Sequence, residues 1–374
     1  MTTSLLHIYL IFIVLFLLLA GTTGCNVSNQ PSVQHSPVKT TVPGIVSKLD
    51  STTSLEKVSA NASQLLKKKN FLELEKLASQ ARTSKERLAG GYWKLYAIYY
   101  GLNTPGMGNV PSNQDWSDHI ARLEDWKKAI PDSATARIAL AESWIHYGFE
   151  ARGTGYINSV SEENLRLFLN RVETGYKELV EAKNLSQKCP EWYVAMLRVG
   201  LADSWPRTEY DRIFEEGFAL EPTYYHLQRE KISYLLPHWN GYPGELAAFI
   251  TDNSERIEGD EGKIMYFLLL STLQSVYHER IFDEVKVSWD KARLGYEKLK
   301  QHYTVDRYRK NQYAFLALFA KNNDISIMTN AMDEVGDDWD PEVWPSKEYF
   351  DRMSKATKSI KETAAKNGGK LIAN

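Results

Sequence analysis

The stretch PDSATARIALAESWIHYGFEAR, residues 131–152, decides the fold class, because it is typical of one long helix with apolar side chains on nearly every side. Asp132 or Ser133 can cap its start, since a short side-chain oxygen accepts a hydrogen bond from a free backbone N–H there. Two apolar stripes follow at helical spacing: Ala136, Leu140, Trp144, Tyr147 and Ala151 form one, and Ile138, Ile145 and Phe149 form the other. A helix of this kind is usually buried among other helices, so we expect packed helices around it.

Three polar side chains interrupt this apolar helix. Glu142, His146 and Glu150 follow one another at intervals of four residues, which favours one common side. Because a buried carboxylate is costly unless it is paired or hydrogen-bonded, we expect either a nearby cation or a groove open to water. The candidate partners are Arg137, Arg152 and Arg166. A closed polar network in the core and the polar wall of a binding site are both compatible with this pattern.

The composition of the chain is that of a globular protein. It has 374 residues, of which 43% are hydrophobic and 12% aromatic, and this length suits one large or two ordinary domains. The formal net charge of −2 argues against a nucleic-acid partner, which needs a basic surface. Only two cysteines, Cys25 and Cys189, are present. If the first is modified, the second is a single thiol, so we expect no disulfide in the fold.

The N-terminus looks like an export signal. Residues 10–25, LIFIVLFLLLAGTTGC, form an apolar run that ends in small residues and a cysteine, as in a secretory signal peptide. This ending resembles a bacterial lipobox, which implies a signal peptide over residues 1–24 and a lipidated Cys25 as the mature N-terminus. Two features depart from that pattern: Thr22 stands where leucine is usual, and MTTSLLH before the run has no lysine or arginine. An uncleaved membrane anchor and an ordinary secreted protein are the alternatives.

Residues 25–54 form a segment rich in Ser, Thr, Pro, Asn and Gln. Such a segment buries too little apolar surface to order itself, and as a flexible coil it spans on the order of 30 Å. We therefore expect a lipidated cysteine, a disordered tether and a folded domain in that order. The location that this implies is the bacterial cell envelope, where a membrane-anchored lipoprotein faces the periplasm or the exterior.

From residue 55 to residue 350 the pattern is helical, and one stretch resembles a helix-pair repeat. PEWYVAMLRVGLADSWPRTEYDRIFEEGFALEP, residues 190–222, predicts a helix, a turn at Pro206 and a second helix. The second half matches the large, aromatic, small and proline positions of a tetratricopeptide repeat: Tyr210, Phe214, Gly217 and Pro222. Arg198, in the first half, stands where that repeat has a small residue. We predict an all-α fold, a degenerate tetratricopeptide-like α-solenoid of antiparallel helix pairs.

Four segments, in this order, make a resemblance specific enough to name. They are ARIALAESWIHYGFEARGTGYINSV (residues 136–160), PEWY (190–193), FEEGFALEPTYY (214–225) and LLPHWNGYPGE (235–245). Together they resemble a bacterial domain family of unknown function that is tetratricopeptide-like and often found behind signal sequences. The similarity would cover about residues 68–350. It implies this fold and an exported setting, but no activity and no catalytic residues.

No catalytic, metal or cofactor motif stands out in the sequence. GTGYIN, residues 153–158, lacks the third glycine of a dinucleotide loop and follows a helix. The acidic segment GDDWDPEVWP, residues 336–345, has oxygen ligands that a hard cation prefers, but it lacks EF-hand spacing, so we expect a solvated loop. Residues 351–374 form a basic helix or tail, with Lys355, Lys358 and Lys361 at intervals of three. This stripe is either a solvated end or a surface for anionic lipid. We expect no metal and no cofactor.

The function that we expect from the sequence is binding. The concave side of such a solenoid makes an extended site for a peptide or a partner protein. The residues predicted to line that site are Glu142, His146, Glu150, Arg152, Tyr156 and Trp239. Two alternatives are an enzyme of unrecognised class, which would use Glu142, Glu150 and Arg152 beside the loop that follows them, and a purely structural envelope protein.

Overall fold

The fold is helical wherever the structure describes it. The computed structural model describes residues 54–106, 110–153, 155, 159–185, 188–320 and 324–366, all within the unit Pro37–Asn374. In these ranges regular structure is confined to helices, with one isolated bridge between Arg87 and Trp93. The all-α prediction is therefore confirmed. The predicted signal peptide, Cys25 and nearly all of the tether lie outside the described residues, as does Tyr156.

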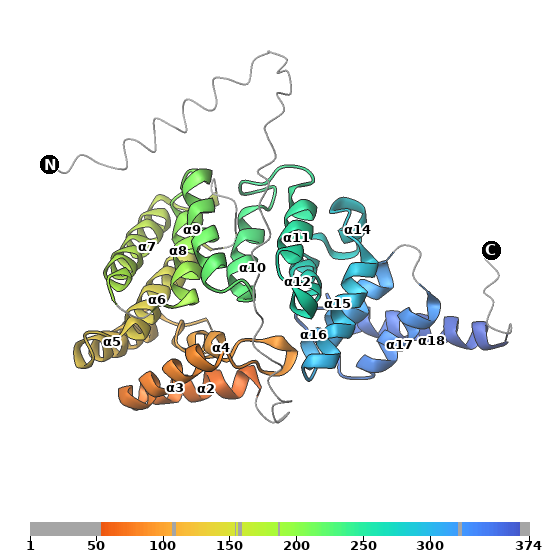
Figure 1. Ribbon diagram of the computed structural model, residues 1–374, viewed down its shortest axis with the longest axis horizontal. Coiled ribbons are helices and arrows are strands. Elements are labelled where there is room, and N and C mark those ends of the chain that lie inside the picture. The colour runs from red at the N-terminus through yellow and green to blue at the C-terminus, as the bar shows by residue number, and fades with distance from the viewer. Residues whose placement is uncertain are drawn as a thin grey trace, which may run out of the picture. The chain divides into compact units, whose positions relative to one another are not determined.

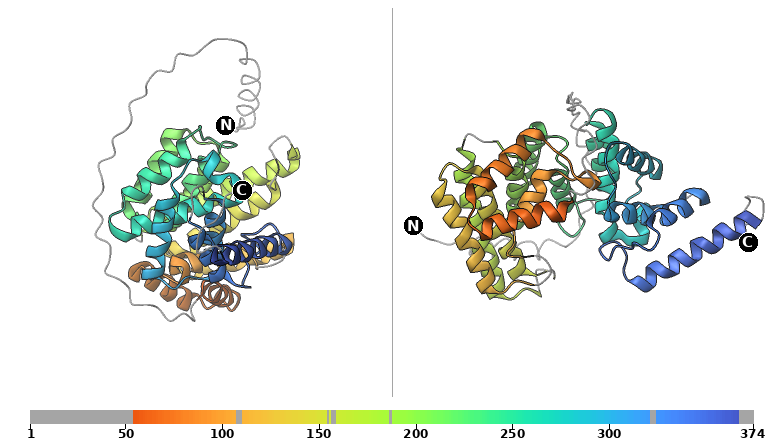
Figure 2. Two further views of the ribbon diagram at one scale, coloured as in Figure 1. Left: turned by 90° about the vertical axis from the view of Figure 1, so that its right-hand side faces the viewer. Right: turned by 90° about the horizontal axis from the view of Figure 1, so that it is seen from below.

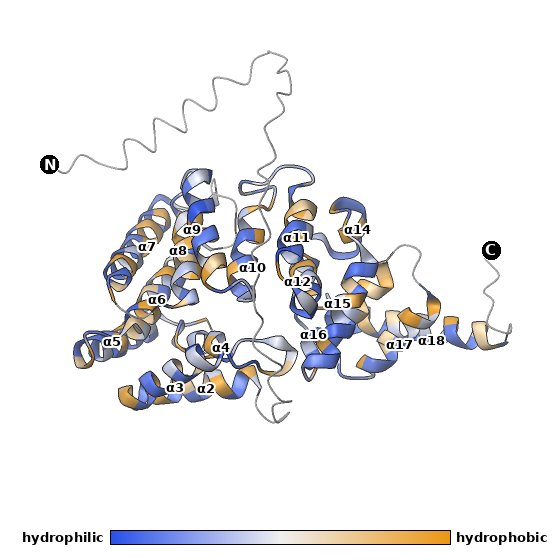
Figure 3. Ribbon diagram, in the orientation of Figure 1, coloured by the Kyte–Doolittle hydropathy of each residue, from blue (hydrophilic) through white to orange (hydrophobic). Residues whose placement is uncertain are grey.

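The helices follow one another with short connections (Figure 1). They are α2 (Leu55–Lys67), α3 (Phe71–Ser84), α4 (Lys94–Tyr100), α5 (Asn113–Ala129), α6 (Ala134–Arg152), α7 (Glu162–Lys183), α8 (Pro190–Ala202), α9 (Arg207–Leu220), α10 (Tyr225–Tyr234), α11 (Glu245–Glu255), α12 (Gly259–Thr272), α13 (Gln274–Tyr277), α14 (Ile281–Glu284), α15 (Trp289–His302), α16 (Arg307–Phe319), α17 (Ile325–Val335) and α18 (Lys347–Lys366). Short 3-10 turns lie at Ala89–Gly91 and His278–Arg280. Most helices carry both apolar and polar residues (Figure 3), so each helix needs neighbours to cover its apolar side.

The helices pack as pairs that repeat along the chain. α6 packs against α7, α8 against α9, α12 against α15, and α16 against α17. In addition, α6 contacts α8, α8 contacts α10, α10 contacts α12, and α12 contacts α16. This second set forms an inner row, flanked by the partner of each pair. The arrangement is an all-α helical-repeat fold, in which each unit covers the apolar side of the next.

Helix α6 is buried as its apolar pattern predicts. Ser133 caps it, with Ser133 Oγ accepting a hydrogen bond from Ala136 N at 2.8 Å. Leu140 and Ile145, one from each predicted stripe, are completely buried. Close approach of α7 depends on Gly175, because a Cβ there would lie 2.7 Å from the backbone oxygen of Ala141. The small residue thus allows the two longest helices of this region to touch backbone to backbone.

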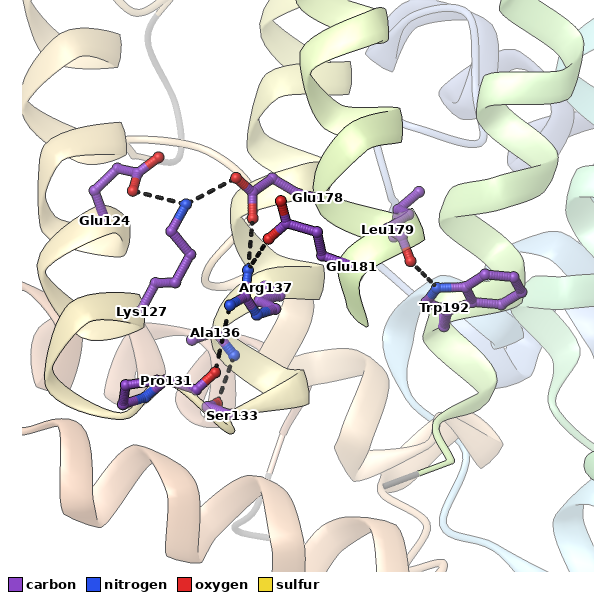
Figure 4. A network of polar contacts seen from close by, with 10 residues as sticks. All are labelled: Glu124, Lys127, Pro131, Ser133, Ala136, Arg137, Glu178, Leu179, Glu181 and Trp192. Carbon is purple, nitrogen blue, oxygen red and sulfur yellow. Dashed lines mark hydrogen bonds and ion pairs between the residues drawn. The ribbon is translucent and has the colours of Figure 1, made fainter. Parts of the chain in front are cut away.

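Ion pairs join α5, α6 and α7 on the side shown in Figure 4. Lys127 Nζ lies 2.7 Å from Glu178 Oε1 and 2.9 Å from Glu124 Oε2. Arg137 Nη1 lies 3.4 Å from Glu178 Oε2 and 2.5 Å from Glu181 Oε2. Arg137, one of the cations expected beside Glu142, is therefore engaged by α7 instead.

The connection between α3 and α4 reaches a distant part of the chain. Gly90 N donates a hydrogen bond to Thr304 O at 2.7 Å, just before α16. Gly90 has a positive φ of 72°, and a Cβ there would lie 2.7 Å from Asp306 Oδ2, so glycine is required. Trp93 Nε1 donates to Thr223 O at 3.0 Å, just before α10. These contacts bring α4, α10 and α16 next to one another.

The acidic segment at residues 336–345 is only partly solvated. Asp337, Asp338 and Glu342 are exposed, as expected. Asp340, in contrast, is buried, and its Oδ2 lies 2.9 Å from Arg307 Nε. Asn311 Oδ1 accepts hydrogen bonds from Asp340 N at 3.2 Å and from Trp344 Nε1 at 2.6 Å. The expectation of a fully solvated loop is corrected here, because this part of the segment packs on α16.

The basic C-terminal segment forms α18, which begins at Lys347, slightly before the predicted boundary at residue 351. Phe350 and Thr357 are its buried residues, and it packs on α17. Its later turns extend past α17 (Figure 2). Lys361 of the basic stripe pairs with Asp333 of α17. In the described part of the chain, no helix is long and apolar enough to cross a membrane.

Candidate functional site

The cation that pairs with Glu142 is Arg198 of α8. Arg198 Nη1 lies 2.9 Å from Glu142 Oε1, and Arg198 Nη2 lies 2.9 Å from Glu230 Oε1 of α10. His146 lies on the same side of α6, with its Nε2 3.4 Å from Arg198 Nη1. Burial lowers the pKa of His146 to about 3, and the charge of Arg198 lowers it too, so the ring is neutral and can accept this hydrogen bond. Glu142 therefore pairs with Arg198 of the next helix pair, and not with the expected Arg137, Arg152 or Arg166.

A second carboxyl group, Glu191 of α8, completes this buried network. Glu142 and Glu191 are both fully buried and lie within hydrogen-bonding reach of each other. Burial raises the pKa of Glu142 well above its usual range, and the adjacent Glu191 raises it further, whereas Arg198 lowers it. Burial also raises the pKa of Glu191, while Arg198 and the hydroxyl that Tyr224 donates to it act in the opposite sense.

We infer that this pair shares one proton, because burial raises the pKa of both carboxyl groups. Glu142 Oε2 and Glu191 Oε1 are each buried without a hydrogen-bond partner. Two ionised carboxylates would repel each other in this position, and a proton carried by Glu142 removes that repulsion. Since neither side chain has any exposed surface, a molecule from solvent does not reach them. The pair therefore holds the helices together and offers no accessible general base in this conformation.

Glu150 points away from this network. It is exposed, and its Oε2 accepts a hydrogen bond from Trp116 Nε1 of α5 at 2.8 Å. Eight residues along an α-helix turn the side chain by about 80° from its starting direction, which carries Glu150 away from the side that faces Arg198. The expectation that Glu142, His146 and Glu150 share one side is thus correct for the first two only.

Arg152 and Trp239, two further predicted site residues, do lie together. The Arg152 guanidinium carbon lies 5.2 Å from the centre of the Trp239 ring, within the range of a cation–π contact. Arg152 Nη1 also donates to the backbone oxygen of Gly153 at 3.1 Å. This pair joins the end of α6 to the connection between α10 and α11, away from the Arg198 network.

An arginine that the sequence reasoning missed lies beside the Arg198 network. Arg229 of α10 follows His226 by one helical turn, so their side chains are neighbours. The His226 ring stacks on the ring of Tyr96 of α4, with centroids 3.2 Å apart and planes 10° apart. Tyr100, one turn further along α4, has its ring centre 5.8 Å from that of Tyr96. Arg229 thus faces α4.

The third side of this region is α16. Arg309 is buried, and its guanidinium lies 5.4 Å from the centre of the Tyr225 ring and 5.6 Å from that of Tyr308. Burial raises the pKa of Tyr308 to about 12, with smaller opposing effects from the charges of Arg309 and Arg229. Arg229 also acts on Tyr100, where burial is the larger effect and raises the pKa. We call Tyr96, Tyr100, Tyr225, Arg229 and Tyr308 the Arg229 cluster.

Arg229 as a whole is an exposed residue, although its charge lies among protein groups that partly desolvate it. Among the described residues, none accepts a hydrogen bond from its guanidinium or forms an ion pair or ring contact with it. Tyr96 is only 8% exposed, whereas Tyr100, on the same helix, is 41% exposed. Among the described residues, the cluster therefore combines an arginine without a partner with the phenolic hydroxyls of Tyr96, Tyr100 and Tyr308, which have no hydrogen-bond partner there.

Comparisons of the chain with protein-family models, curated proteins and solved structures returned no match. The resemblance drawn from the four sequence segments therefore stays a prediction.

One sequence signal could have located part of this site. Arg198 occupies a position at which a tetratricopeptide repeat has a small residue, and a large charged side chain there has to be accommodated between helices. Arg229 and Glu191 give no comparable signal, because their partners lie on helices far apart in the sequence.

Proposed function

We propose that this chain is a binding protein of the bacterial cell envelope, a tetratricopeptide-like solenoid that holds a peptide or a partner protein at the Arg229 cluster. The observation that carries the proposal is Arg229, an exposed residue that is unpaired among the described side chains, with tyrosines of α4, α10 and α16 around it. Arginine and tyrosine are the side chains most often found at the energetic centre of protein interfaces.

Burial of the acidic pair favours binding over catalysis at this place. Glu142, the expected base of an enzyme, is enclosed with Glu191 and engaged by Arg198. Burial raises the pKa of Tyr96 to about 12 and also raises the pKa values of Tyr100 and Tyr308, so at neutral pH these three carry their protons and act as hydrogen-bond donors. Such an array recognises a ligand more readily than it moves a proton.

The tetratricopeptide-like assignment is part of the same proposal. Support comes from the inner row of helices and from Gly217 of α9, where a Cβ would lie 2.8 Å from the side chain of Tyr193 on α8. A small residue is thus needed where that repeat has one. Arg198 departs from the repeat, and in this proposal the departure supports the wall of the binding site.

A lipid anchor at Cys25 would hold the domain near a membrane. The support is the sequence pattern before Cys25 and the polar segment that follows it. A tether of this length would let the binding domain search a layer on the order of 30 Å deep above the membrane.

Photo-crosslinking in intact cells tests the proposal. p-Benzoylphenylalanine replaces Tyr100, which is 41% exposed within the cluster, and in a matched control it replaces Tyr242, which is 70% exposed between α10 and α11. We expect a discrete protein or peptide adduct from position 100 that Arg229→Gln removes and that position 242 does not give. Identical adducts from both positions, or an adduct that persists in Arg229→Gln, would contradict the proposed site. No adduct at all would favour the purely structural alternative.

A further inference from the structure

We propose that the group held by Arg229 is a carboxylate of a peptide, either its C-terminus or an Asp or Glu side chain. This inference rests on the proposed function, since it names the chemistry of the ligand at the same cluster. It follows from the charges around the cluster, from the donors that line it and from the acidic groups at its edge.

Of Arg198, Arg229 and Arg309, only Arg229 has no ion pair and no hydrogen-bond acceptor among the described residues. Arg198 is engaged by Glu142 and Glu230. Arg309 is buried and donates to Gln312 Oε1 at 2.7 Å and to Gly90 O at 3.4 Å. Arg229 is exposed and has no partner among the described side chains. An arginine without a described partner favours an anionic ligand.

The donors around Arg229 fit a planar acceptor. A guanidinium presents parallel N–H groups that match the two oxygens of a carboxylate. The hydroxyls of Tyr96, Tyr100 and Tyr308 have no hydrogen-bond partner among the described residues, so they are free to donate to the ligand. His146 and His226, in the same field, are held neutral by burial and by the nearby arginines.

Acidic groups near the cluster disfavour a phosphate dianion. The charge of Glu342 acts on both Tyr100 and Tyr308, and that of Glu56 acts on Tyr100. These carboxylates repel a doubly charged ligand more strongly than a singly charged one. The exposed ring of Tyr100 offers contact area for the residue beside the carboxylate, which favours a peptide over a small inorganic anion.

Chemical labelling of arginine tests this inference without a known ligand. The full chain, purified in detergent, is treated with phenylglyoxal, and the modification of Arg229 is followed by peptide mass mapping relative to exposed Arg166 of α7. The protectants are random hexapeptide pools, N-acetylated and prepared as C-terminal acids or amides, with and without Asp and Glu. Inorganic phosphate is the competing anion.

We expect carboxylate-bearing pools to slow the labelling of Arg229 at least about 10-fold, the scale of a hydrogen bond to a charged group, and to leave Arg166 unchanged. If peptides with a free C-terminus but without Asp or Glu protect Arg229, the C-terminal carboxylate is the bound group. If C-terminally amidated peptides that contain Asp or Glu protect it, a side-chain carboxylate is the bound group. The affinity of the protective peptide pool, measured by fluorescence anisotropy, should fall about 10- to 100-fold in Arg229→Gln. It should stay constant in the control Arg166→Gln.

Three outcomes would overturn the inference. Protection by neutral amides equal to that by acids would show peptide binding without carboxylate recognition, which leaves the proposed function intact. Stronger protection by phosphate would reject the carboxylate. No protection by any pool, together with no crosslink from position 100, would reject the ligand chemistry and the binding function together. Because Arg229 is exposed, loss of folding in Arg229→Gln is not expected, and its melting temperature checks this.

Discussion

The substitution Glu142→Gln probes the shared proton most directly. Arg198 is in contact with Glu142 and Glu230, and Glu191 lies beside Glu142. If Glu142 carries a proton in the folded state, glutamine replaces a neutral acid by a neutral amide of nearly the same shape. We then expect a cost of about 1 kcal/mol or less at low pH, the scale of one altered hydrogen bond. An ionised Glu142 in a buried pair would instead make the loss about 3–5 kcal/mol.

The stability of wild type relative to Glu142→Gln should change with pH in one direction. Glu142 has a folded pKa raised well above its reference value of 4.5, so between these two values the folded state binds more protons than the unfolded state. The stability that the proton contributes is complete below the unfolded pKa and is lost as the pH rises through the folded pKa. Wild type should therefore lose up to about 1.4 kcal/mol per pH unit relative to Glu142→Gln above pH 4.5.

Urea unfolding followed by tryptophan fluorescence between pH 5 and pH 8 measures this difference. Glu150→Gln is a matched control, since Glu150 lies on the same helix but is exposed and accepts a single bond from Trp116. This control should change the free energy of unfolding by about 1 kcal/mol or less. A Glu142→Gln protein that is less stable than wild type by about 3–5 kcal/mol at every pH would refute the shared proton.

Three further predictions concern the network, acid stability and the anchor. Arg198→Met should lower the free energy of unfolding by about 3–5 kcal/mol, because it leaves Glu230 and the negative charge shared by Glu142 and Glu191 without a cation; a loss under about 1 kcal/mol in urea unfolding would show that the ion pair is dispensable. Burial lowers the pKa of His119 to about 4, so this neutral ring contributes stability that is present above pH 6.5 and is lost as the pH falls from 6.5 towards 4. His119→Gln should flatten the acid limb of a thermal-melting series, and an unchanged limb would assign acid unfolding to other groups. Cys25→Ala should abolish palmitate labelling and release the protein from membranes on fractionation; unchanged labelling would reject the lipobox.

Local patterns allowed the fold class and the central helix to be predicted. The apolar stripes of residues 131–152 and the cap at Ser133 depend on neighbours within a few residues, and α6 begins and ends within three residues of that stretch. Helix pairing follows from the same local patterns, because an apolar side needs a cover. The contact between Arg152 and Trp239 was also anticipated in part, since both were assigned to one site.

Partners across the fold could not be predicted from the sequence. Glu142 had several arginines within reach along the chain, and the pairing with Arg198 is decided by how α6 packs on α8. Glu150 shows a different limit: helical phase accumulates with distance, so a spacing of eight residues no longer defines one side. Arg229 was missed because the tyrosines around it belong to α4 and α16, which only the folded chain brings near α10.

The hydrogen bond from Gly90 to Thr304 has a consequence for how the protein comes apart. In a repeat array whose ends are free, terminal units fray while the middle persists. Here the connection between α3 and α4 is bonded to the backbone just before α16, so loss of the first helices removes support from α16. We therefore expect removal of α2–α4 to destabilise α16 as well, and a ligand that contacts α4, α10 and α16 to raise the melting temperature of these helices together.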